Sequence, residues 1–375
     1  MHTRIRATYS PEADIPKAPA ERAWLYRPDR AWTYSHHPFL AHFDGRYVAM
    51  WSNGREDEDA PGQRVLMATS PDFRTWSEPA PLVDSMMGEK TELVLTPAGF
   101  HQHQGTLGAY VGQYEYTPDV LDHGRRPKAP VGFRNAKLWA ITARDLGTWG
   151  DPIDLGLPMV PNQGPEPTRS GRLLISGNVW FPHTDDPAGL SGWSIAGICP
   201  AELIDDFADH QQGWHEAQEA AGWPAGLCEG SWYQTDDGVV HTLLRSGTER
   251  LWVTESADDG ETWSEPRPTG FPNARSKFHC GRLPDGRFYV VGNPDPRSAW
   301  PRNPLVLSLS DDGRSFDRHV ILADEHREMA APGMHKGGDY GYPHTLIHDS
   351  HLCVIVSRQK EAVEALRIPL AELGE

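Results

Sequence analysis

Charged, imidazole and phenol side chains recur in this sequence beside short apolar runs. They stand where one run begins or where the following run ends, and six pairs of runs share this arrangement. Arginine and lysine bind carboxylates, and histidine and tyrosine transfer protons when their pKa values lie near the working pH. The run starts carry His36 and His37, Glu92, Glu166, Glu229, Lys277 with His279, and Tyr342 with His344. The run ends carry Asn53, Arg55, Tyr114, Asn178, Arg245, Asn293 and Arg358.

The elements that must position these groups are short strands joined by turns. Each pair of runs surrounds a turn signal such as Asp44-Gly-Arg46 or Pro284-Asp-Gly286, which is typical of two antiparallel strands. Most units continue into a third run, as at 64–69, 137–142 and 251–254. Four-stranded units repeated around an axis form a β-propeller. We therefore expect an all-β fold, a single propeller with six countable blades, whose strand starts and ends bring the polar groups to one funnel.

A second repeat lies between the units. Ser256-Ala-Asp-Asp-Gly-Glu-Thr-Trp263 has serine and aspartate side chains that can accept backbone N–H groups, and Gly260 permits a positive φ. Related copies are Leu309 to Phe316, in which Asp311 takes the place of the aspartate, Ser70 to Trp76 and Ala143 to Trp149. Four copies in one chain predict a repeat protein.

The motif resembles the Asp-box of sialidase-like β-propellers, and the resemblance extends over nearly the whole chain. It implies that the box is structural and lies on the outer rim, and that ligands bind near the axis. Sialidases resemble one another in an early Phe/Tyr-Arg-Ile-Pro motif, an arginine triad and a Tyr–Glu nucleophile pair. That early motif is absent, since Arg367-Ile-Pro lies near the other end of the chain, and no Tyr–Glu pair stands out.

Length and composition support one domain. A chain of 375 residues with 33 Pro and 36 Gly suits many short strands, and we expect an arm at 1–30 that closes the ring and a propeller at 31–375. A net charge of −17 argues against nucleic-acid and membrane partners. The start of the sequence has no apolar leader, which predicts a cytoplasmic protein. Four scattered cysteines predict neither a disulfide framework nor a zinc site.

Other short motifs resemble propellers that act on L-rhamnose linked α-1,4 to D-glucuronate, known as α-L-rhamnosidases or rhamnose–glucuronate lyases. These motifs are Ser35-His-His-Pro38, Trp51-Ser-Asn-Gly-Arg55, Gly62-Gln-Arg64, Gln163-Gly-Pro165, Lys277-Phe278, Gly281 to Arg287, Gly341-Tyr-Pro-His344 and Leu366 to Leu370. The resemblance implies seven blades and a catalytic histidine, which matches His36. Because side chains alternate along a strand, His36 and His37 should point to opposite faces.

The residues leave the reaction open. Hydrolysis uses two carboxylates, for which Glu92, Glu166 and Glu229 are available. Elimination needs a cation for the uronate, a base and an acid, and the many His, Tyr, Arg and Lys groups favour it slightly.

We predict an enzyme that cleaves terminal L-rhamnose from α-1,4-linked D-glucuronate in arabinogalactan-type glycans. The alternatives are an exo-sialidase-like hydrolase and a non-catalytic sugar-binding propeller. The partner is a glycan that bears a carboxylate; no cofactor is indicated, although a structural metal ion could occupy the central channel. The predicted catalytic residues are His36 with Tyr342 or His344. The predicted carboxylate ligands are Arg55, Arg245, Arg358 and Lys277, and the predicted hydroxyl ligands are Asn53, Gln163 and Glu229.

Overall fold

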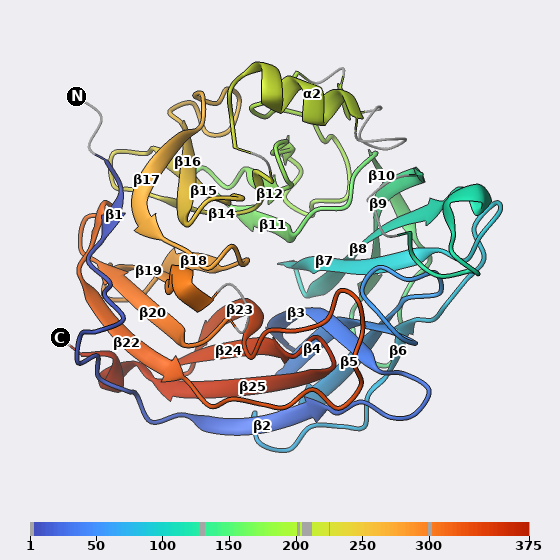
Figure 1. Cartoon of the computed structure of the whole chain (residues 1–375), viewed down its shortest axis with the longest axis horizontal. Coiled ribbons are helices and arrows are strands. Elements are labelled where there is room, and N and C mark those ends of the chain that lie inside the picture. The colour runs from blue at the N-terminus through green and yellow to red at the C-terminus, as the bar shows by residue number, and fades with distance from the viewer. Residues whose placement is uncertain are drawn as a thin grey trace.

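The computed structural model describes residues 4–127, 132–200, 203–204, 212–224, 226–298 and 302–374. Strands dominate these residues and form six sheets arranged around a central axis (Figure 1). The all-β propeller expected from the repeats is therefore confirmed. The described residues form six blades, the number counted from the strand pairs, whereas the resemblance to rhamnose-cleaving propellers implied seven.

Each blade begins with its innermost strand. The first two blades contain β3 (Tyr34–Phe43), β4 (Arg46–Gly54), β5 (Arg64–Ser70) and β6 (Ala80–Val83), then β7 (Val94–His103), β8 (Thr106–Tyr116), β9 (Phe133–Ala143) and β10 (Ile153–Leu157). The third contains β11 (Gln163–Pro167), β12 (Leu173–Ser176) and β13 (His183–Thr184).

The remaining blades follow the same pattern. The fourth contains β14 (Cys228–Gln234), β15 (Val240–Arg245), β16 (Arg250–Ser256) and β17 (Arg267–Pro272), extended by the short parallel strands β1 (Arg6–Ala7) and β21 (Ser315–Phe316). The fifth contains β18 (His279–Arg282), β19 (Phe288–Gly292), β20 (Leu305–Ser310) and β22 (Arg318–Ala323), and the sixth contains β23 (Gly341–His348), β24 (His351–Arg358), β25 (Ala362–Pro369) and β2 (Glu21–Tyr26).

Strand β2 comes from the N-terminal arm and is the outer strand of the last blade. It pairs antiparallel with β25, with Glu21 opposite Arg367 and Arg22 opposite Leu366 (Figure 1). The last blade therefore combines the two ends of the chain.

The weakly patterned segment at 195–225 contains the α-helix α2 (Gln212–Ala220). Short 3₁₀ turns lie at Pro118–Val120, Pro296–Ser298 and Leu370–Leu373. No helix in the described part of the chain is long and apolar enough to cross a membrane.

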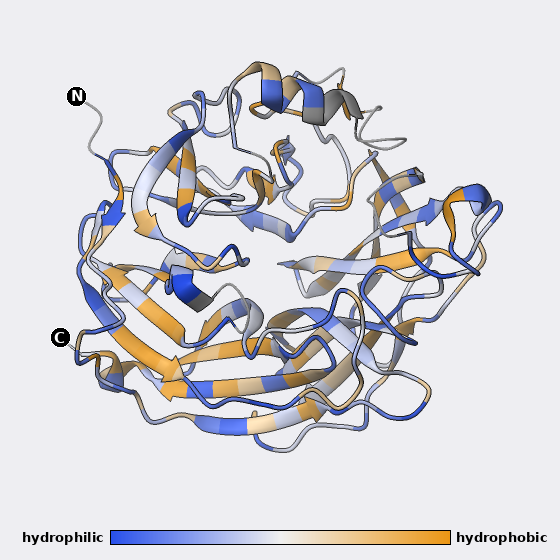
Figure 2. Ribbon diagram, viewed as in Figure 1, coloured by the Kyte–Doolittle hydropathy of each residue, from blue (hydrophilic) through white to orange (hydrophobic). Residues whose placement is uncertain are grey.

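The core lies between neighbouring blades. Leu307 on β20 packs in one buried cluster with Val354 on β24, and the apolar faces of these strands are visible as orange segments in Figure 2. Trp51 on β4 is fully buried in a cluster that also contains Ile355. Because each blade buries its faces against the next, the innermost strands are held in fixed positions around the axis.

The Asp-boxes are turns between the third and fourth strands. Between β16 and β17, the Asp258 carboxylate accepts Thr262 N–H at 2.9 Å and the Ser256 hydroxyl at 2.8 Å, while Trp263 Nε1 donates to Gly260 O. In the copy between β20 and β22, Asp312 rather than Asp311 accepts two backbone N–H groups. The expected assignment to Asp311 was wrong because Asp312 follows Ser310 by two residues, as Asp258 follows Ser256.

Candidate active site

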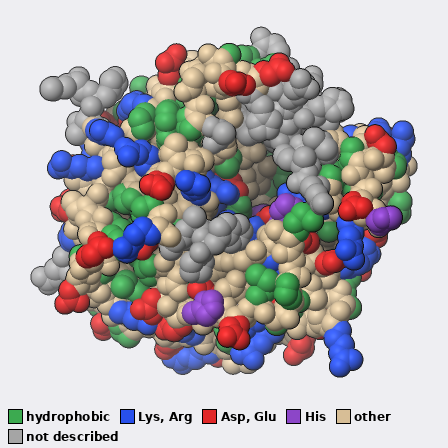
Figure 3. Space-filling model, in the orientation of Figure 1, with side chains coloured by type: hydrophobic (Ala, Val, Ile, Leu, Met, Phe, Trp, Pro, Cys, Tyr) green, Lys and Arg blue, Asp and Glu red, His purple; other side chains and the backbone are tan. Residues whose placement is uncertain are grey.

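A cavity of about 550 Å³ lies where the innermost strands begin. The face shown in Figure 3 is hollowed near its centre. Basic and acidic side chains line the cavity together, and an apolar wall completes it. The charged groups are Arg126, Arg245, Arg302, Lys360, Glu58, Asp59 and Glu229, and the other lining residues include His37, Asn162, Asn178, Tyr342, Phe133, Ala136, Val160 and Met334.

Three innermost strands turn a side chain into this cavity by the same local device. His37 on β3, Glu229 on β14 and Tyr342 on β23 have φ values of 51°, 51° and 53°. Each lies where the pairing with the next strand shifts register. An extra residue of this kind bends a strand and re-aims its side chain. Left-handed backbone in a non-glycine residue is costly and clusters at functional sites, so these bulges mark the site.

Tyr342, Glu229 and Arg245 form a hydrogen-bonded group at the cavity. The Tyr342 hydroxyl donates to Glu229 Oε1. Arg245 NH1 lies 2.7 Å from Glu229 Oε2 and 3.3 Å from the Tyr342 oxygen. Neighbouring Asn178 accepts the Glu229 N–H through its side-chain oxygen at 3.4 Å. The phenol is therefore aligned with a carboxylate that can accept its proton.

The charges of this group support the same arrangement. Burial opposes ionisation of Glu229, but Arg245, together with the Tyr342 hydroxyl and Arg302, outweighs it and holds the pKa of the carboxyl below its usual value. Burial, together with Glu229, raises the pKa of Tyr342 well above the ordinary phenol value. At neutral pH the resting pair is thus a neutral phenol beside a carboxylate, with the proton already directed at its acceptor.

A second pair of carboxylates, Glu58 and Asp59, also lines the cavity. Lys360 Nζ binds Glu58 Oε1 at 2.7 Å, and Arg126 NH1 lies 3.6 Å from Glu58 and 3.8 Å from Asp59. Burial raises the pKa of Asp59 above its usual value. Burial acts in the same direction at Glu58, but the cations Lys360 and Arg126 oppose it and the pKa of Glu58 is lowered. Asp59 is therefore suited to donate a proton while its neighbour stays charged.

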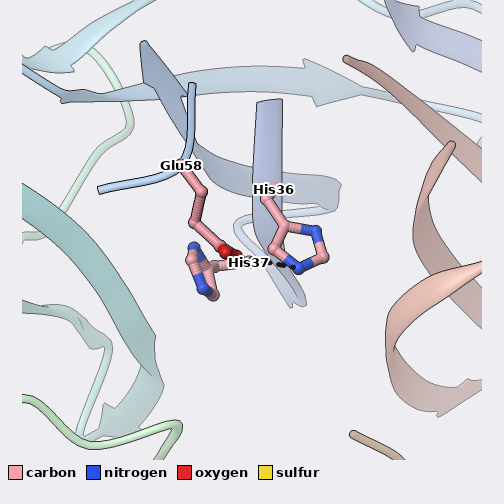
Figure 4. A group of neighbouring side chains, drawn as sticks. All are labelled: His36, His37 and Glu58. Atoms are coloured by element: carbon pink, nitrogen blue, oxygen red, sulfur yellow. Dashed lines mark ion pairs between the residues drawn. The ribbon is translucent and has the colours of Figure 1, made fainter. Parts of the chain in front are cut away.

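The two histidines of β3 lie on the same side of the strand. Their ring centroids are 4.6 Å apart, and Figure 4 shows both rings beside the Glu58 carboxylate. The expectation from strand alternation was wrong because the bulge at His37 interrupts it. His37 lines the cavity, whereas His36 is fully buried behind it, with its ring 4.0 Å from that of Tyr342. The predicted catalytic residue His36 therefore lies outside the cavity wall.

His36, His37 and Glu58 are spaced as metal ligands could be. Lys360 and Arg126 already pair with Glu58, however. Burial lowers the pKa of His36 most, and Lys360, Arg302 and Lys277 lower it further. These same positive charges would repel a divalent cation. The cluster does not fit a metal.

The four predicted carboxylate ligands do not meet at one site. Arg245 lines the cavity, but Arg55 is half-exposed and forms two bonds with Glu92 at 2.7 and 2.8 Å. Arg358 is buried within the last blade, where it binds Glu364. Lys277 is buried beneath the site, donates to Asn162 O and lies 5.5 Å from the centre of the Tyr342 ring. Competing carboxylates and carbonyls thus hold three of the four away from the cavity.

Three further predicted residues also lie outside the cavity lining. Asn53 is buried and donates to Tyr34 O and Ser35 Oγ. Gln163 is buried and donates to Glu166 at 2.7 Å. His344 lies two residues below Tyr342 and packs against His279, with ring centroids 4.4 Å apart. These contacts hold the three side chains in place, although the buried Gln163 Oε1 has no hydrogen-bond partner among the described residues.

A second cluster of possible metal ligands lies among the innermost strands, where a structural metal ion was expected. Glu166, His279 and His344 come from three innermost strands, and His279 Nε2 lies 3.6 Å from Glu166. His344 Nδ1, however, accepts the Leu40 N–H at 3.3 Å, so the other nitrogen of the neutral ring carries a proton. A protonated nitrogen cannot ligate a metal. The set fits a metal ion poorly.

Several cavity residues were not predicted from the sequence. The stretch Glu56 to Asp59 reads as a solvated loop, yet Glu58 and Asp59 face the cavity because that loop folds back over β3 and β4. The connecting segments contribute three further cavity residues, Arg126, Arg302 and Lys360. Only residues where strands begin or end were considered as candidates from the sequence, so these three were not included. The Tyr342–Glu229 pair joins residues separated by 113 positions, a separation that no local motif reveals.

The fold and this site define a propeller of the Asp-box class. Residues 45–354 match the family described as "BNR repeat-like domain", and the chain belongs to that family. No curated protein matches the chain.

Solved structures with the same fold include a protein of unknown function from Dyadobacter fermentans, at 16% identity and a TM-score of 0.67, covering 95% of this chain and all of the other. A sialidase matches at 20% identity and a TM-score of 0.66, over 98% of this chain but 35% of its own length. Trypanosoma rangeli sialidase matches at 13% identity and 0.63, over 95% and 60% respectively. At these identities the likeness shows the fold.

Proposed function

We propose that the protein is an exo-acting glycoside hydrolase that uses Tyr342 as its nucleophile on a terminal sugar bearing an anionic group. The observation that carries this proposal is the hydrogen-bonded set of Tyr342, Glu229 and Arg245 at the cavity. A nucleophile paired with a base that a third group orients is the general signature of covalent catalysis. Sialidases share such a Tyr–Glu pair, and tyrosine replaces the usual carboxylate nucleophile in them.

The charges of the cavity support an anionic substrate. Four cationic side chains and three carboxylates line it, and Asp59 binds a proton more readily than an ordinary aspartate. The excess of positive charge attracts an anion. A neutral phenol is also a better nucleophile for such a sugar than a carboxylate, because two negative charges repel each other at close range.

In the proposed reaction, the Tyr342 oxygen attacks the anomeric carbon while Glu229 accepts the phenol proton. Asp59 donates a proton to the leaving oxygen, so the glycosidic bond breaks as the bond to tyrosine forms. Water then attacks the anomeric carbon of this intermediate. Its proton passes to Asp59, the tyrosine oxygen leaves and regains its proton from Glu229, and the enzyme returns to its initial state.

The test is to trap the intermediate. The protein is incubated with fluorogenic glycosides of N-acetylneuraminate, D-glucuronate and L-rhamnose, quenched in acid and digested for mass spectrometry. We expect fluorophore release and a sugar adduct on the peptide that contains Tyr342. The Tyr342→Phe variant provides the matched control, because it removes one oxygen and retains the ring. Wild-type activity in that variant, or turnover without an adduct under burst conditions, would contradict the proposal.

A second candidate is the cleavage of rhamnose from glucuronate by elimination. It is supported by the closeness of His37 to Tyr342, with ring centroids 5.0 Å apart, beside guanidinium groups that could neutralise a uronate. Digestion of an arabinogalactan distinguishes the candidates. An unsaturated uronate absorbs in the ultraviolet and marks elimination, whereas released rhamnose without that absorbance marks hydrolysis. Binding without either product indicates a sugar-binding propeller.

A further inference from the structure

His37 presents a single ring nitrogen to the cavity. The β-bulge on β3 gives it a left-handed backbone and turns its ring toward the lining. Its ring lies edge-on to that of Tyr342, at 5.0 Å between centroids. A group in this position touches whatever sugar is bound at the tyrosine oxygen.

The hydrogen bonds around His37 determine which nitrogen carries the proton. The Ser52 hydroxyl lies 2.8 Å from the backbone oxygen of His36, and a carbonyl can only accept, so Ser52 donates its proton there. Ser52 Oγ also lies 2.9 Å from His37 Nδ1. Because the serine proton is already used, His37 Nδ1 is the donor in that short contact. The Tyr34 hydroxyl also lies 3.5 Å from Nδ1 and can accept there, so this longer contact is compatible with the same tautomer. The neutral ring then has a bare Nε2.

The surrounding charges keep this ring neutral. Burial is the largest effect and lowers the pKa of His37 to about 4, and the cations Lys277 and Lys360 act in the same direction. The carboxylates Glu58 and Glu229 also face the ring and act in the opposite direction, without reversing the result. His37 therefore offers an acceptor, and no positive charge, over the physiological pH range.

We propose that His37 is a specificity-determining residue whose bare Nε2 accepts a hydrogen bond from a hydroxyl group of the terminal sugar. This inference rests on the proposed function, in that the sugar is the one held at Tyr342. A carboxylate has no proton to offer this nitrogen and is directed to Arg245 and Arg302 instead. The ligand class is thus a sugar acid with a hydroxyl close to its reacting carbon.

The first test needs no substrate. Long-range ¹H–¹⁵N correlation spectra of the full chain report the tautomer of each histidine, and His37→Asn assigns the signal. We expect the Nδ1–H tautomer for His37 at pH 7 and its loss in Ser52→Ala. Ser357→Ala is the matched control, since Ser357 contacts His36 Nδ1 at 2.5 Å, and it should leave the His37 signal unchanged. An Nε2–H tautomer or an imidazolium at pH 7 overturns the inference.

The second test measures recognition. We compare kcat/KM for the best glycoside with each of its monodeoxy analogues, in wild type and in His37→Ala. In wild type, removing the recognised hydroxyl should lower kcat/KM by roughly 10- to 100-fold, the worth of one lost hydrogen bond in a desolvated site. In His37→Ala that difference should disappear. The inference is overturned if removing the hydroxyl lowers kcat/KM equally in wild type and in His37→Ala. It is also overturned if the affinity of wild type alone rises as the pH falls through about 6.5, because that would show a charged His37.

The two proposals fail in different ways. If no glycoside is cleaved, the proposed hydrolase is wrong, and calorimetric binding of free D-glucuronate and its deoxy analogues replaces kcat/KM in the comparison. If glycosides are cleaved but the spectra show the other tautomer, only the role of His37 is wrong.

Discussion

The Tyr342 hydroxyl donates a hydrogen bond to Glu229, across two innermost strands from different blades. If this contact activates the nucleophile, Glu229→Gln should lower kcat by roughly 10²–10⁴-fold, the usual worth of a general base. The amide retains the shape of the side chain but cannot take the proton. Stopped or fluorogenic assays measure kcat, and a melting temperature within a few degrees of wild type shows that the fold is retained. Unchanged kcat would contradict the assignment.

The second prediction concerns pH. Asp59 must be protonated to act as an acid, and its pKa is raised by burial. Activity should therefore persist well above the ordinary aspartate pKa of about 3.9 and fall as the pH rises through the raised value. Asp59→Asn should remove this alkaline limb together with most of the activity toward substrates with poor leaving groups. An alkaline limb that survives in Asp59→Asn would assign the acid to another group.

The third prediction separates the arginines. Arg245 and Arg302 line the cavity, and Arg55 pairs with Glu92 outside it. D-glucuronate should raise the melting temperature of wild type and of Arg55→Met, because binding to the folded state stabilises it. The shift should be lost in Arg302→Met, while D-glucose should give no shift in any of the three. Loss of the shift in Arg55→Met would restore the earlier interpretation of that residue.

The fourth prediction concerns the buried Lys277. Burial lowers its pKa to about 8, from 10.5, so the folded state loses up to about 3 kcal/mol by holding the charge. Replacement with Met should raise stability most below pH 8, where lysine is charged in both states. The gain should shrink as the pH rises from 8 toward 10.5, because the folded protein then releases the proton first. Denaturant unfolding at several pH values measures this, and a gain independent of pH would contradict it.

The fifth prediction tests the Asp-box. Asp258→Ala removes an acceptor for Thr262 N–H and Ser256 Oγ, at a cost of about 1–3 kcal/mol. Activity per folded molecule should persist, because the turn lies between outer strands. The exposed carboxylate of Asp311 provides a matched control in the neighbouring box, where Asp312 makes the corresponding bonds. Equal destabilisation by Asp311→Ala would argue against this assignment.

The blade pattern could be predicted because it depends on local signals. Turn residues such as Asp44-Gly45 and the box glycine Gly260 specify backbone conformations that few other residues adopt. The site could be predicted only in part. The rule that site residues lie where strands begin or end correctly predicted Tyr342, Glu229 and Arg245, all of which line the cavity. The same rule wrongly predicted Arg55 and Arg358. Each pairs with a carboxylate outside the cavity, and a sequence does not show which carboxylate an arginine will pair with.

Two structural features account for the remaining errors. A β-bulge adds one residue to a strand and changes every face assignment near it. Pro38 follows His37 directly, and proline within a strand marks a bulge, a strand start or an edge. The sequence does not show which of these applies, so the bulge at His37 was not predicted. Glu58 and Asp59 were missed for a related reason, since a loop's direction depends on ion pairs with Lys360 and Arg126, which are distant in sequence.

The pairing of β2 with β25 has a consequence for biosynthesis. The last blade, which carries Tyr342 on β23, needs an N-terminal strand and three C-terminal strands in one sheet. A ribosome delivers the first of these long before the others, at about 5–20 residues per second. Strand β2 of the N-terminal arm therefore remains unpaired while the chain of the other five blades is synthesised. Tyr342 is among the last groups to be ordered. A nascent chain that is released early would have the scaffold and Glu229 but no nucleophile.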